Sequence, residues 1–421
     1  MSKNRMAPPI RFQGFTEPWE QRKLGEIAEY KKGPFGSALK KDFFIPDSAT
    51  SVKVYEQQNA INKNWNLSRY YISKEYAQKL KSFEVHAGDI IVSCAGTIGE
   101  IYELPAQSRS GIINQALMRI RVNEDIVCKD IFKLAFSNMI DSFSREFSNG
   151  SAIKNIPPFA DLKPMKILLP NKAEQTIIGD FFTDIDKTIT LHQHKLEQQK
   201  KLKKYFLQNM FPEEGETVPR IRFKGFTGDW EQRKLGDISS VIDPHPSHRA
   251  PVETQTGIPF IGIGDVDEAG NVDYSTARIV DEKIYEEHHK RYDLAIPSVG
   301  IGRVASLGKV IRLRNDIGKY AVSPTMSIIQ FSQEVDVNYM YSCMSSPYFQ
   351  QQFTAQSSGS TRQSVGIQDL RRFMIPIPQN KIEQINIGMF FWKLDNLITH
   401  HQRKIDQLQA MKKFMLQNLF V

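Results

Sequence analysis

The segment GIGDVDEAGN, residues 262–271, has glycines and carboxylates of the kinds found in ligand-binding loops. A dinucleotide loop would need a third glycine at the start of a helix, and a calcium loop would need a polar ligand at Ala269 and a glutamate at Thr276. We therefore expect a strand and a tight turn. Four histidines lack a cysteine or paired carboxylate at ligand spacing, so we expect solvated surface histidines and no metal site: His245, His248, His288 and His289.

A second segment that could carry chemistry is NIPPF, residues 155–159, which comes close to the Asn-Pro-Pro-Phe element that grips an extruded adenine in amino-methyltransferases. Here Ile156 separates the asparagine from the prolines, and we find no glycine-rich cofactor loop after a predicted strand. The sequence also has no serine-hydrolase elbow, P-loop lysine or Cys-His signature. We therefore expect no catalytic residue in this chain.

The composition, with 40% apolar and 24% charged residues in 421, is ordinary for a globular protein of two or three domains. A net charge of +8 and a pI near 9.1 make a polyanionic partner plausible. No run approaches the roughly 18 apolar residues of a membrane-spanning helix, and the N-terminus has no apolar signal core, so we expect a cytoplasmic protein. Cys94, Cys128 and Cys343 form no C-x-x-C pair, and we expect reduced, mostly structural thiols.

The chain repeats itself. Residues 10–27 return as residues 221–238 with 14 of 18 positions identical, at a constant offset of 211. The ends of the two halves repeat as well, as KKYFLQNMF at 203–211 and KKFMLQNLF at 412–420. The sequence therefore predicts two copies of one fold.

Each half ends in a long segment without proline, in which apolar residues recur at alternating steps of four and three. The spacing averages 3.5 residues over more than four heptads, which indicates a coiled-coil helix. About 37 residues would form a rod of about 55 Å. We expect the two helices to pack against each other, antiparallel; the alternative is that each folds back on its own half. The predicted seam consists of Ile178, Phe182, Ile185, Ile189, Leu196, Phe206, Ile387, Phe391, Leu394, Ile398, Ile405 and Leu408.

The middles of the two halves, about 28–160 and 239–369, show short apolar runs broken by Gly, Pro, Asn and Asp, which indicate strands of mixed α/β domains. Their identity is sparse, although residues 89–99 resemble residues 293–302 in their aspartate and glycines. We expect one fold with two different surfaces.

Basic loops are the remaining candidates for a functional surface. The segment at 30–44, YKKGPFGSALKKDFF, combines four lysines with glycines that allow close approach to phosphates. Segments 149–155 and 358–364 offer small hydroxyls beside a lysine or an arginine. Lysines suit phosphates, whereas Arg, Gln and Asn can read base edges. The predicted DNA-binding residues are Lys31, Lys32, Ser37, Lys40, Lys41, Gln57, Asn59, Ser151 and Lys154 in the first domain, and Arg249, Arg303, Ser360, Arg362 and Gln363 in the second.

Together, these features resemble the specificity subunit of Type I restriction-modification systems. The resemblance covers essentially the whole chain and rests on GFTxxWEQRKLGxI occurring twice, on a Glu-Gln pair after both Pro170 and Pro378, and on the duplicated helix end LQN-(Met or Leu)-Phe. It implies a non-catalytic subunit with two target recognition domains, each reading one half of a split DNA sequence, joined by an antiparallel coiled coil.

The resemblance also implies partners. Two modification subunits would bring S-adenosylmethionine for adenine methylation, and restriction subunits would bring ATP and magnesium; this chain would hold no cofactor or metal of its own. Two alternatives stay open: a self-contained adenine DNA methyltransferase, and a tandem-repeat adaptor that binds proteins. The expected divisions are 1–27, repeated N-terminal segment; 28–160, first recognition domain; 161–211, central region with a long helix; 212–238, connector and second repeated segment; 239–369, second recognition domain; and 370–421, C-terminal region with a long helix.

Overall fold

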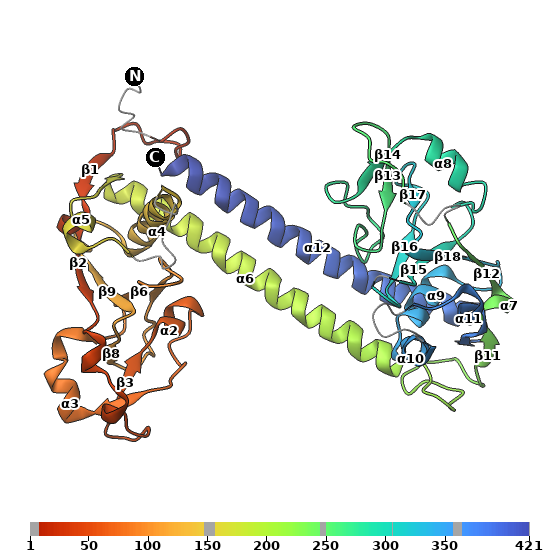
Figure 1. Ribbon diagram of the computed structural model, residues 1–421, viewed down its shortest axis with the longest axis horizontal. Helices are drawn as coiled ribbons and strands as arrows, with labels where there is room; N and C mark the ends of the chain where they lie inside the picture. The colour runs from red at the N-terminus through yellow and green to blue at the C-terminus, as the bar shows by residue number, and fades with distance from the viewer. Residues whose placement is uncertain (1–7, 147–155, 245–249, 305, 357–363, 421) are drawn as a thin grey trace. The chain divides into compact units, whose positions relative to one another are not determined.

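The computed structural model describes residues 8–146, 156–244, 250–304, 306–356 and 364–420 (Figure 1). The chain forms two compact units: unit 1 consists of Met1–Thr188 with Leu408–Val421, and unit 2 consists of Ile189–Gln407. Each unit contains one mixed α/β domain together with part of each of two long helices, α6 and α12. The mixed fold and the internal repeat predicted from the sequence are confirmed.

Unit 1 begins with the repeated segment and continues into its α/β domain. Its elements are β1 (Glu20–Lys23), α1 (Leu24–Ile27), β2 (Ala28–Lys32), the 3-10 turns η1 (Gly36–Ala38) and η2 (Lys41–Phe43), β3 (Ser51–Tyr55), α2 (Gln57–Ile61), β4 (Tyr71–Ser73), α3 (Lys74–Lys79), η3 (Lys81–Phe83), β5 (Glu84–Val85), β6 (Ile90–Ser93), β7 (Ile101–Glu103), β8 (Gly111–Ile113), β9 (Leu117–Val122), α4 (Lys129–Glu146), α5 (Phe159–Leu162), β10 (Lys166–Leu169) and the first part of α6 (Lys172–Asn209).

Two four-stranded sheets form the domain of unit 1. The first, in the order β2-β9-β6-β7, is antiparallel throughout, and β6 is buried along its whole length. The second, in the order β4-β3-β8-β5, contains a parallel pair, β3 with β8. Helix α4 packs its apolar face, including Phe132 and Phe136, against Ile90 and Ile120 of the first sheet. A separate ladder pairs β1 with β10, which ties the repeated segment to the strand that precedes α6.

Unit 2 follows the same plan. Its elements are β11 (Glu231–Lys234), α7 (Leu235–Ile238), β12 (Ser239–Ile242), β13 (Ile258–Ile261), β14 (Arg278–Val280), α8 (Lys283–His288), β15 (Ser298–Gly302), β16 (Val310–Leu313), β17 (Ala321–Val322), β18 (Met326–Phe331), α9 (Val337–Met344), α10 (Pro347–Gln356), α11 (Ile367–Arg372), β19 (Met374–Ile377) and most of α12 (Lys381–Leu419). The sheets are β12-β18-β15-β16, β14-β13-β17 and the ladder β11-β19.

Strand pairing fixes which residues of the two units correspond. Ile90 pairs with Ile120, and Val299 pairs with Ile329, so the two pairs stand 209 residues apart in the chain. In the resemblance of residues 89–99 to 293–302, Asp89 matches Asp293, which lies 204 residues later. This match differs from the strand register by five residues, because strand pairing, and not a shared aspartate and glycines, sets the register.

The two long helices begin in the same way. Each follows a proline and an asparagine whose side chain caps the first turn: Asn171 Oδ1 accepts the Glu174 backbone N–H at 3.0 Å, and Asn380 Oδ1 accepts the Ile382 N–H at 2.9 Å. Of the predicted seam residues, Phe206 is half-buried, and the structure places the others in the interior: Ile178, Phe182, Ile185, Ile189, Leu196, Ile387, Phe391, Leu394, Ile398, Ile405 and Leu408.

Within each unit, the segments of α6 and α12 run antiparallel. In unit 2, His192 lies against His401, and Lys203, further along α6, reaches back to Asp395. In unit 1, Asp186 of α6 accepts a hydrogen bond from Lys412 of α12 at 2.5 Å. No helix within the described ranges is long and apolar enough to cross a membrane.

Candidate nucleic-acid interface

In unit 1, three backbone hydrogen bonds shape one edge of the first sheet, the edge formed by the ends of its strands where β6 ends and β9 begins. The Cys94 N–H donates to Ala116 O at 2.8 Å, and the Gly99 N–H donates to Ser93 O at 2.9 Å. The Ile156 N–H donates to Cys94 O at 3.2 Å. The turn after β6, the start of β9 and the chain entering α5 therefore meet at one place.

Unit 2 repeats these three bonds at the equivalent edge, each shifted by 209 residues. The Arg303 N–H donates to Thr325 O at 2.9 Å, the Gly308 N–H to Gly302 O at 2.9 Å, and the Val365 N–H to Arg303 O at 3.1 Å. Because the backbone contacts agree so closely, the two edges are copies of one framework. The side chains that they carry differ.

The difference is clearest where Cys94 in unit 1 corresponds to Arg303 in unit 2. Cys94 is buried, whereas the side chain of Arg303 is 14% exposed and its guanidinium lies 3.3 Å from the carboxylate of Asp243, which directly follows β12. The position of Asp243 corresponds to Lys32 at the end of β2. The equivalent edges therefore present a lysine in unit 1 and an arginine held by an aspartate in unit 2.

The lysine-rich loop that follows β2 is anchored on both sides. The Gly33 N–H donates to Leu117 O at 2.9 Å, and a Cβ at this glycine would lie 1.8 Å from Asn114 O, so no larger residue fits. On the far side, the Tyr76 hydroxyl donates to Ala38 O at 2.9 Å. These two hydrogen bonds hold the backbone of the loop between Gly33 and Ala38 in place.

Most of the lysines predicted to bind phosphate lie open to solvent around this loop. Lys32, Lys40 and Lys41 are exposed, as is Ser37. Lys31 points to the other face of β2, as alternation along a strand requires, and its Nζ lies 5.0 Å from the ring centroid of Phe83. Lys31 therefore packs on an aromatic ring, whereas the other four side chains are free to meet a partner at the surface.

Two of the predicted base-reading residues have internal roles. Asn59 is 1% exposed; its Oδ1 accepts the Glu56 N–H at 2.8 Å, and its Nδ2 donates to Asn64 O and Leu67 O. The structure contradicts the prediction that Asn59 contacts DNA, because the side chain is buried and both of its N–H groups and its oxygen already bond within the domain. Gln57 is half-buried, and its Nε2 donates to Ala95 O at 2.5 Å and to Thr97 O at 2.9 Å. This side chain positions the turn after β6.

The other predicted residues fall outside the described residues, so their placement stays a prediction: Ser151, Lys154, Arg249, Ser360, Arg362 and Gln363. Asn155 of NIPPF also lies outside them.

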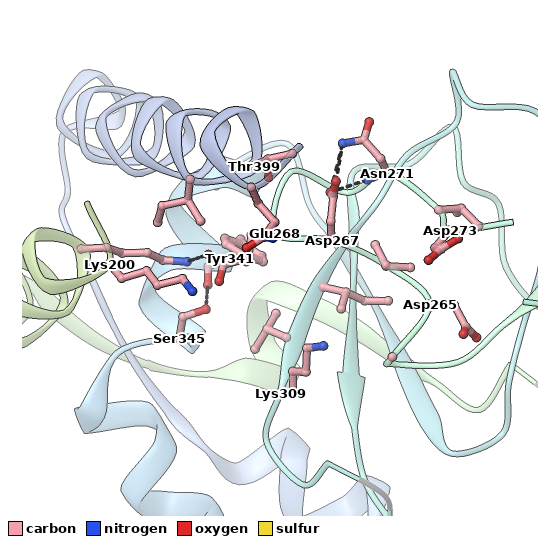
Figure 2. Close-up of a pocket in the computed structure, with 18 of the residues that line it drawn as sticks. Lys200, Asp265, Asp267, Glu268, Asn271, Asp273, Lys309, Tyr341, Ser345 and Thr399 are labelled. Carbon is pink, nitrogen blue, oxygen red and sulfur yellow. Dashed lines mark hydrogen bonds and ion pairs between the residues drawn. The ribbon is translucent and has the colours of Figure 1, made fainter. Parts of the chain in front are cut away.

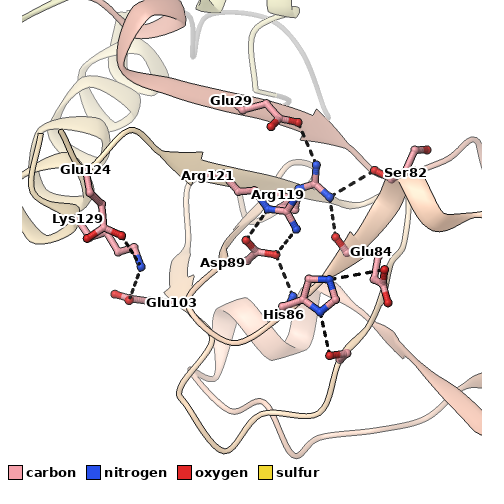
Figure 3. A network of polar contacts seen from close by, with 11 residues as sticks. Glu29, Ser82, Glu84, His86, Asp89, Glu103, Arg119, Arg121, Glu124 and Lys129 are labelled. Atoms are coloured by element: carbon pink, nitrogen blue, oxygen red, sulfur yellow. Dashed lines mark hydrogen bonds and ion pairs between the residues drawn. The ribbon is translucent and has the colours of Figure 1, made fainter. Parts of the chain in front are cut away.

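Figure 3 shows why two arginines of the first domain do not add to this basic surface. Arg119 is 5% exposed, and its guanidinium donates to Glu84 O at 2.6 Å and to the Glu29 carboxylate at 3.1 Å. Arg121 forms a two-point contact with Asp89, at 2.7 and 2.9 Å. Because carboxylates within the domain pair with both guanidinium groups, their charges are offset and add little to the net positive charge of this surface.

A pocket of about 830 Å³ in unit 2 lies between the loop after β13 and the long helices (Figure 2). Two aspartates of this loop bind its own backbone: Asp267 accepts the Ala269 and Asn271 N–H groups at 2.9 and 2.8 Å, and Asp265 accepts the Gly262 N–H at 2.7 Å. The strand and tight turn expected here are confirmed. Among the described residues, no group of three or more His, Cys, Asp or Glu could hold a metal ion.

The side chains of His288 and of two cysteines lie inside the fold. His288 is 0% exposed, so the prediction of a surface histidine is wrong for this residue. His289 is half-buried and stacks on Tyr285, with 3.9 Å between the ring centroids. His245 and His248 lie outside the described residues. Cys94 and Cys343 are buried free thiols, and burial raises the pKa of Cys94 to about 12, which keeps this thiol protonated.

Two residues at the edge of unit 1 were not predicted from the sequence. Phe35, at the tip of the lysine-rich loop, is 89% exposed. Gln115 is exposed beside it, since a Cβ at Gly36 would come within 3.9 Å of the Gln115 amide. An apolar residue between two glycines in a basic loop was a visible signal for Phe35, whereas the place of Gln115 depends on the folded sheet.

Comparison with known proteins agrees with this duplicated architecture. The family described as Type I restriction modification DNA specificity domain matches twice, over residues 16–201 and 227–410. The S subunit of a Type-I restriction-modification system from M. genitalium has a similar structure, with a TM-score of 0.64 and 14% identity over 99% of both chains. A structure described in terms of complex assembly and conformational transition of the type I R-M system has a TM-score of 0.52 and 15% identity, over 95% of this chain and 96% of that one. At these identities the structures show a shared fold, and because the two family matches span most of the sequence, the chain belongs to the Type I restriction-modification DNA specificity family.

Proposed function

We propose that this chain recognises a split, asymmetric DNA sequence, with one half-site read by each α/β domain, and directs partner subunits to it. One observation carries the proposal: the edges of the two first sheets share a backbone framework at an offset of 209 residues but present different side chains. Two like frameworks with unlike reading groups suit a target whose halves differ in sequence.

The expected chemistry follows from the side chains at these edges. Lys32, Lys40 and Lys41 would neutralise phosphates and hold the first domain in register on the duplex. Arg303 would reach a base edge, since a guanidinium can donate twice to guanine. Its contact with Asp243 restricts the rotation of the guanidinium, which favours one donor direction.

We further propose that the chain itself is non-catalytic. Two modification subunits would carry S-adenosylmethionine and transfer its methyl group to adenine, while restriction subunits would carry ATP and magnesium. The repeated segments and the starts of the long helices occur in two copies, which suits two copies of the same partner.

The primary test is a map of methylated adenines in cells that contain the modification subunit, with and without this chain. A split, asymmetric motif that depends on the chain is the expected result. If no such motif appears in cells where the two proteins co-purify, the proposal fails. Replacing residues 28–160 by another domain of the family should change one half of the motif and leave the other half intact.

Two further measurements separate the remaining alternatives. Binding of labelled S-adenosylmethionine to the purified chain without a partner would favour a self-contained methyltransferase. DNA affinity that does not depend on salt concentration would favour a protein-binding adaptor, because phosphate contacts release counterions when they form.

A further inference from the structure

Phe35 differs from the aromatic residues that follow it in the same loop. Phe43 stacks on Tyr76 with 4.4 Å between ring centroids, and Phe44 stacks on Tyr70 at 4.2 Å. Phe35 is 89% exposed. A single exposed apolar side chain is common on protein surfaces and needs no explanation by itself, so the surroundings of Phe35 decide what it means.

The backbone that carries Phe35 is already ordered. Pro34 is buried, and the backbone of Gly33 packs so tightly against Asn114 O that a Cβ would not fit. Phe35 itself is extended, with φ −57° and ψ 148°, and its carbonyl accepts the Ala38 N–H at 2.9 Å as the first bond of η1. A side chain presented from a fixed backbone loses little conformational freedom on binding. The loop is therefore suited to place an aromatic ring in a partner.

The charges around the ring indicate which partner that is. Lys32 precedes the loop, Lys40 and Lys41 follow it, and all three are exposed. The flat faces of neighbouring base pairs are apolar, and phosphates border the grooves through which these faces are reached, so an aromatic ring flanked by lysines matches duplex DNA. Gln115, beside Gly36, adds an amide of the kind that hydrogen-bonds to base edges.

We propose that Phe35 inserts between two neighbouring base pairs of the DNA bound by the first domain and partly unstacks them. Apolar side chains act as wedges of this kind in proteins that deform DNA. This inference rests on the proposed function and assigns a separate role within it. The preferred sequence of these two base pairs would then depend on how easily they unstack, as well as on hydrogen bonds to their bases.

The test uses the full chain in complex with its modification subunits, together with duplexes that carry 2-aminopurine at each position of the first half-site in turn. Fluorescence of this base rises when it unstacks. With the wild-type chain we expect a rise at one step only. With Phe35→Ala we expect this rise to disappear and the affinity to fall about tenfold, as the loss of one aromatic-base contact implies.

Two further variants control for the substitution. Phe35→Leu keeps an apolar wedge and should retain part of the fluorescence rise. Phe414→Ala removes a phenyl ring that is 54% exposed on α12 and should leave both readouts at wild-type values in complexes of equal stoichiometry. This pair separates the position of the ring from the mere loss of an exposed phenylalanine.

Several outcomes would overturn the inference. An unchanged fluorescence rise and affinity with Phe35→Ala would show that the ring does not contact DNA. Loss of affinity without unstacking at any position in the wild type would make Phe35 a backbone contact, and loss of the modification subunit alone would make it a protein contact. Failure of the wild-type complex to bind a specific duplex would instead reject the proposed function.

Discussion

The Nδ1 atoms of His192 and His401 lie 2.9 Å apart, and the two residues are separated by 209 positions, the offset by which the long helices repeat. Each histidine thus faces its own copy. One imidazole must donate and the other accept, so the contact requires that at least one ring be neutral. The contact therefore depends on the protonation state of the two rings.

Acid should weaken this contact. Burial lowers the pKa of both His192 and His401, and the nearby charges of Lys195 and His400 add to the effect. The unfolded chain, with histidine pKa values near 6.5, then binds more protons than the folded chain as the pH falls below about 7. The neutral pair therefore stabilises the folded chain above about pH 7, and this stability is lost as the pH falls through the pKa values of the two histidines. We expect the melting temperature to fall when the pH is lowered from 7.5 to 5.5.

A variant with both His192→Leu and His401→Leu should show a smaller fall, measured by loss of the helical circular dichroism signal. His194→Leu, an exposed position on the same helix, is the matched control and should melt with the wild-type pH dependence. Equal pH dependence in the double variant and the wild type would show that other groups are responsible.

A pair of aspartates, also 209 residues apart, should differ sharply in their contribution to stability. Asp395 is 0% exposed, and Lys203 and Arg312 approach it at 2.6 and 2.7 Å as ion pairs, without well-directed hydrogen bonds. Its copy Asp186 faces Lys412 and is about half exposed. Breaking a buried ion pair by removing one partner costs about 3–5 kcal/mol, whereas an exposed pair contributes less than about 1 kcal/mol.

We therefore expect Asp395→Asn to lower the free energy of unfolding of unit 2 by several kcal/mol and Asp186→Asn to have a small effect on unit 1. Urea unfolding followed by hydrogen exchange, which reports on each unit separately, provides the measurement. Similar losses of unfolding free energy from both substitutions would mean that burial does not determine how much each aspartate's ion pairs contribute to stability.

The stability of the repeated segment of unit 2, residues 221–238, should depend on Arg222. Arg222 donates to both oxygens of Glu383, in the first turn of α12, at 2.7 and 2.9 Å, and this carboxylate is 1% exposed. Arg222→Lys keeps the charge but loses the two-point geometry, so we expect about 3 kcal/mol of destabilisation from Arg222→Ala and only partial rescue by lysine. Arg220→Ala, which removes an exposed pair with Glu213, should leave the unfolding midpoint unchanged. Full rescue by lysine would contradict the geometric argument.

The sequence predicted the repeated parts of this fold better than the parts that differ. Segments 10–27 and 221–238 and the long-helix seams could be recognised because their patterns occur twice and because a 3.5-residue period has one structural meaning. The register between the two α/β domains could not, since long-range strand pairing sets it. Asn59 illustrates the same limit at the candidate site: its residue type suits base reading, but its role depends on carbonyl groups of residues 64 and 67 that only the folded chain brings within reach.

The exposed lysines of the first domain should contribute to DNA binding through charge. Lys41→Ala should weaken binding to specific and non-specific duplexes about equally and should reduce the slope of log K against log salt concentration by about one, since one fewer phosphate is neutralised. Lys187→Ala, on α6, removes a lysine that is similarly exposed and pairs with Asp184, and it should leave the slope unchanged. Loss of discrimination at a single base pair with Lys41→Ala would instead place this lysine in the groove. Because the slope counts phosphate contacts and the discrimination ratio reports on base contacts, the two measurements together assign each lysine of the loop to one role.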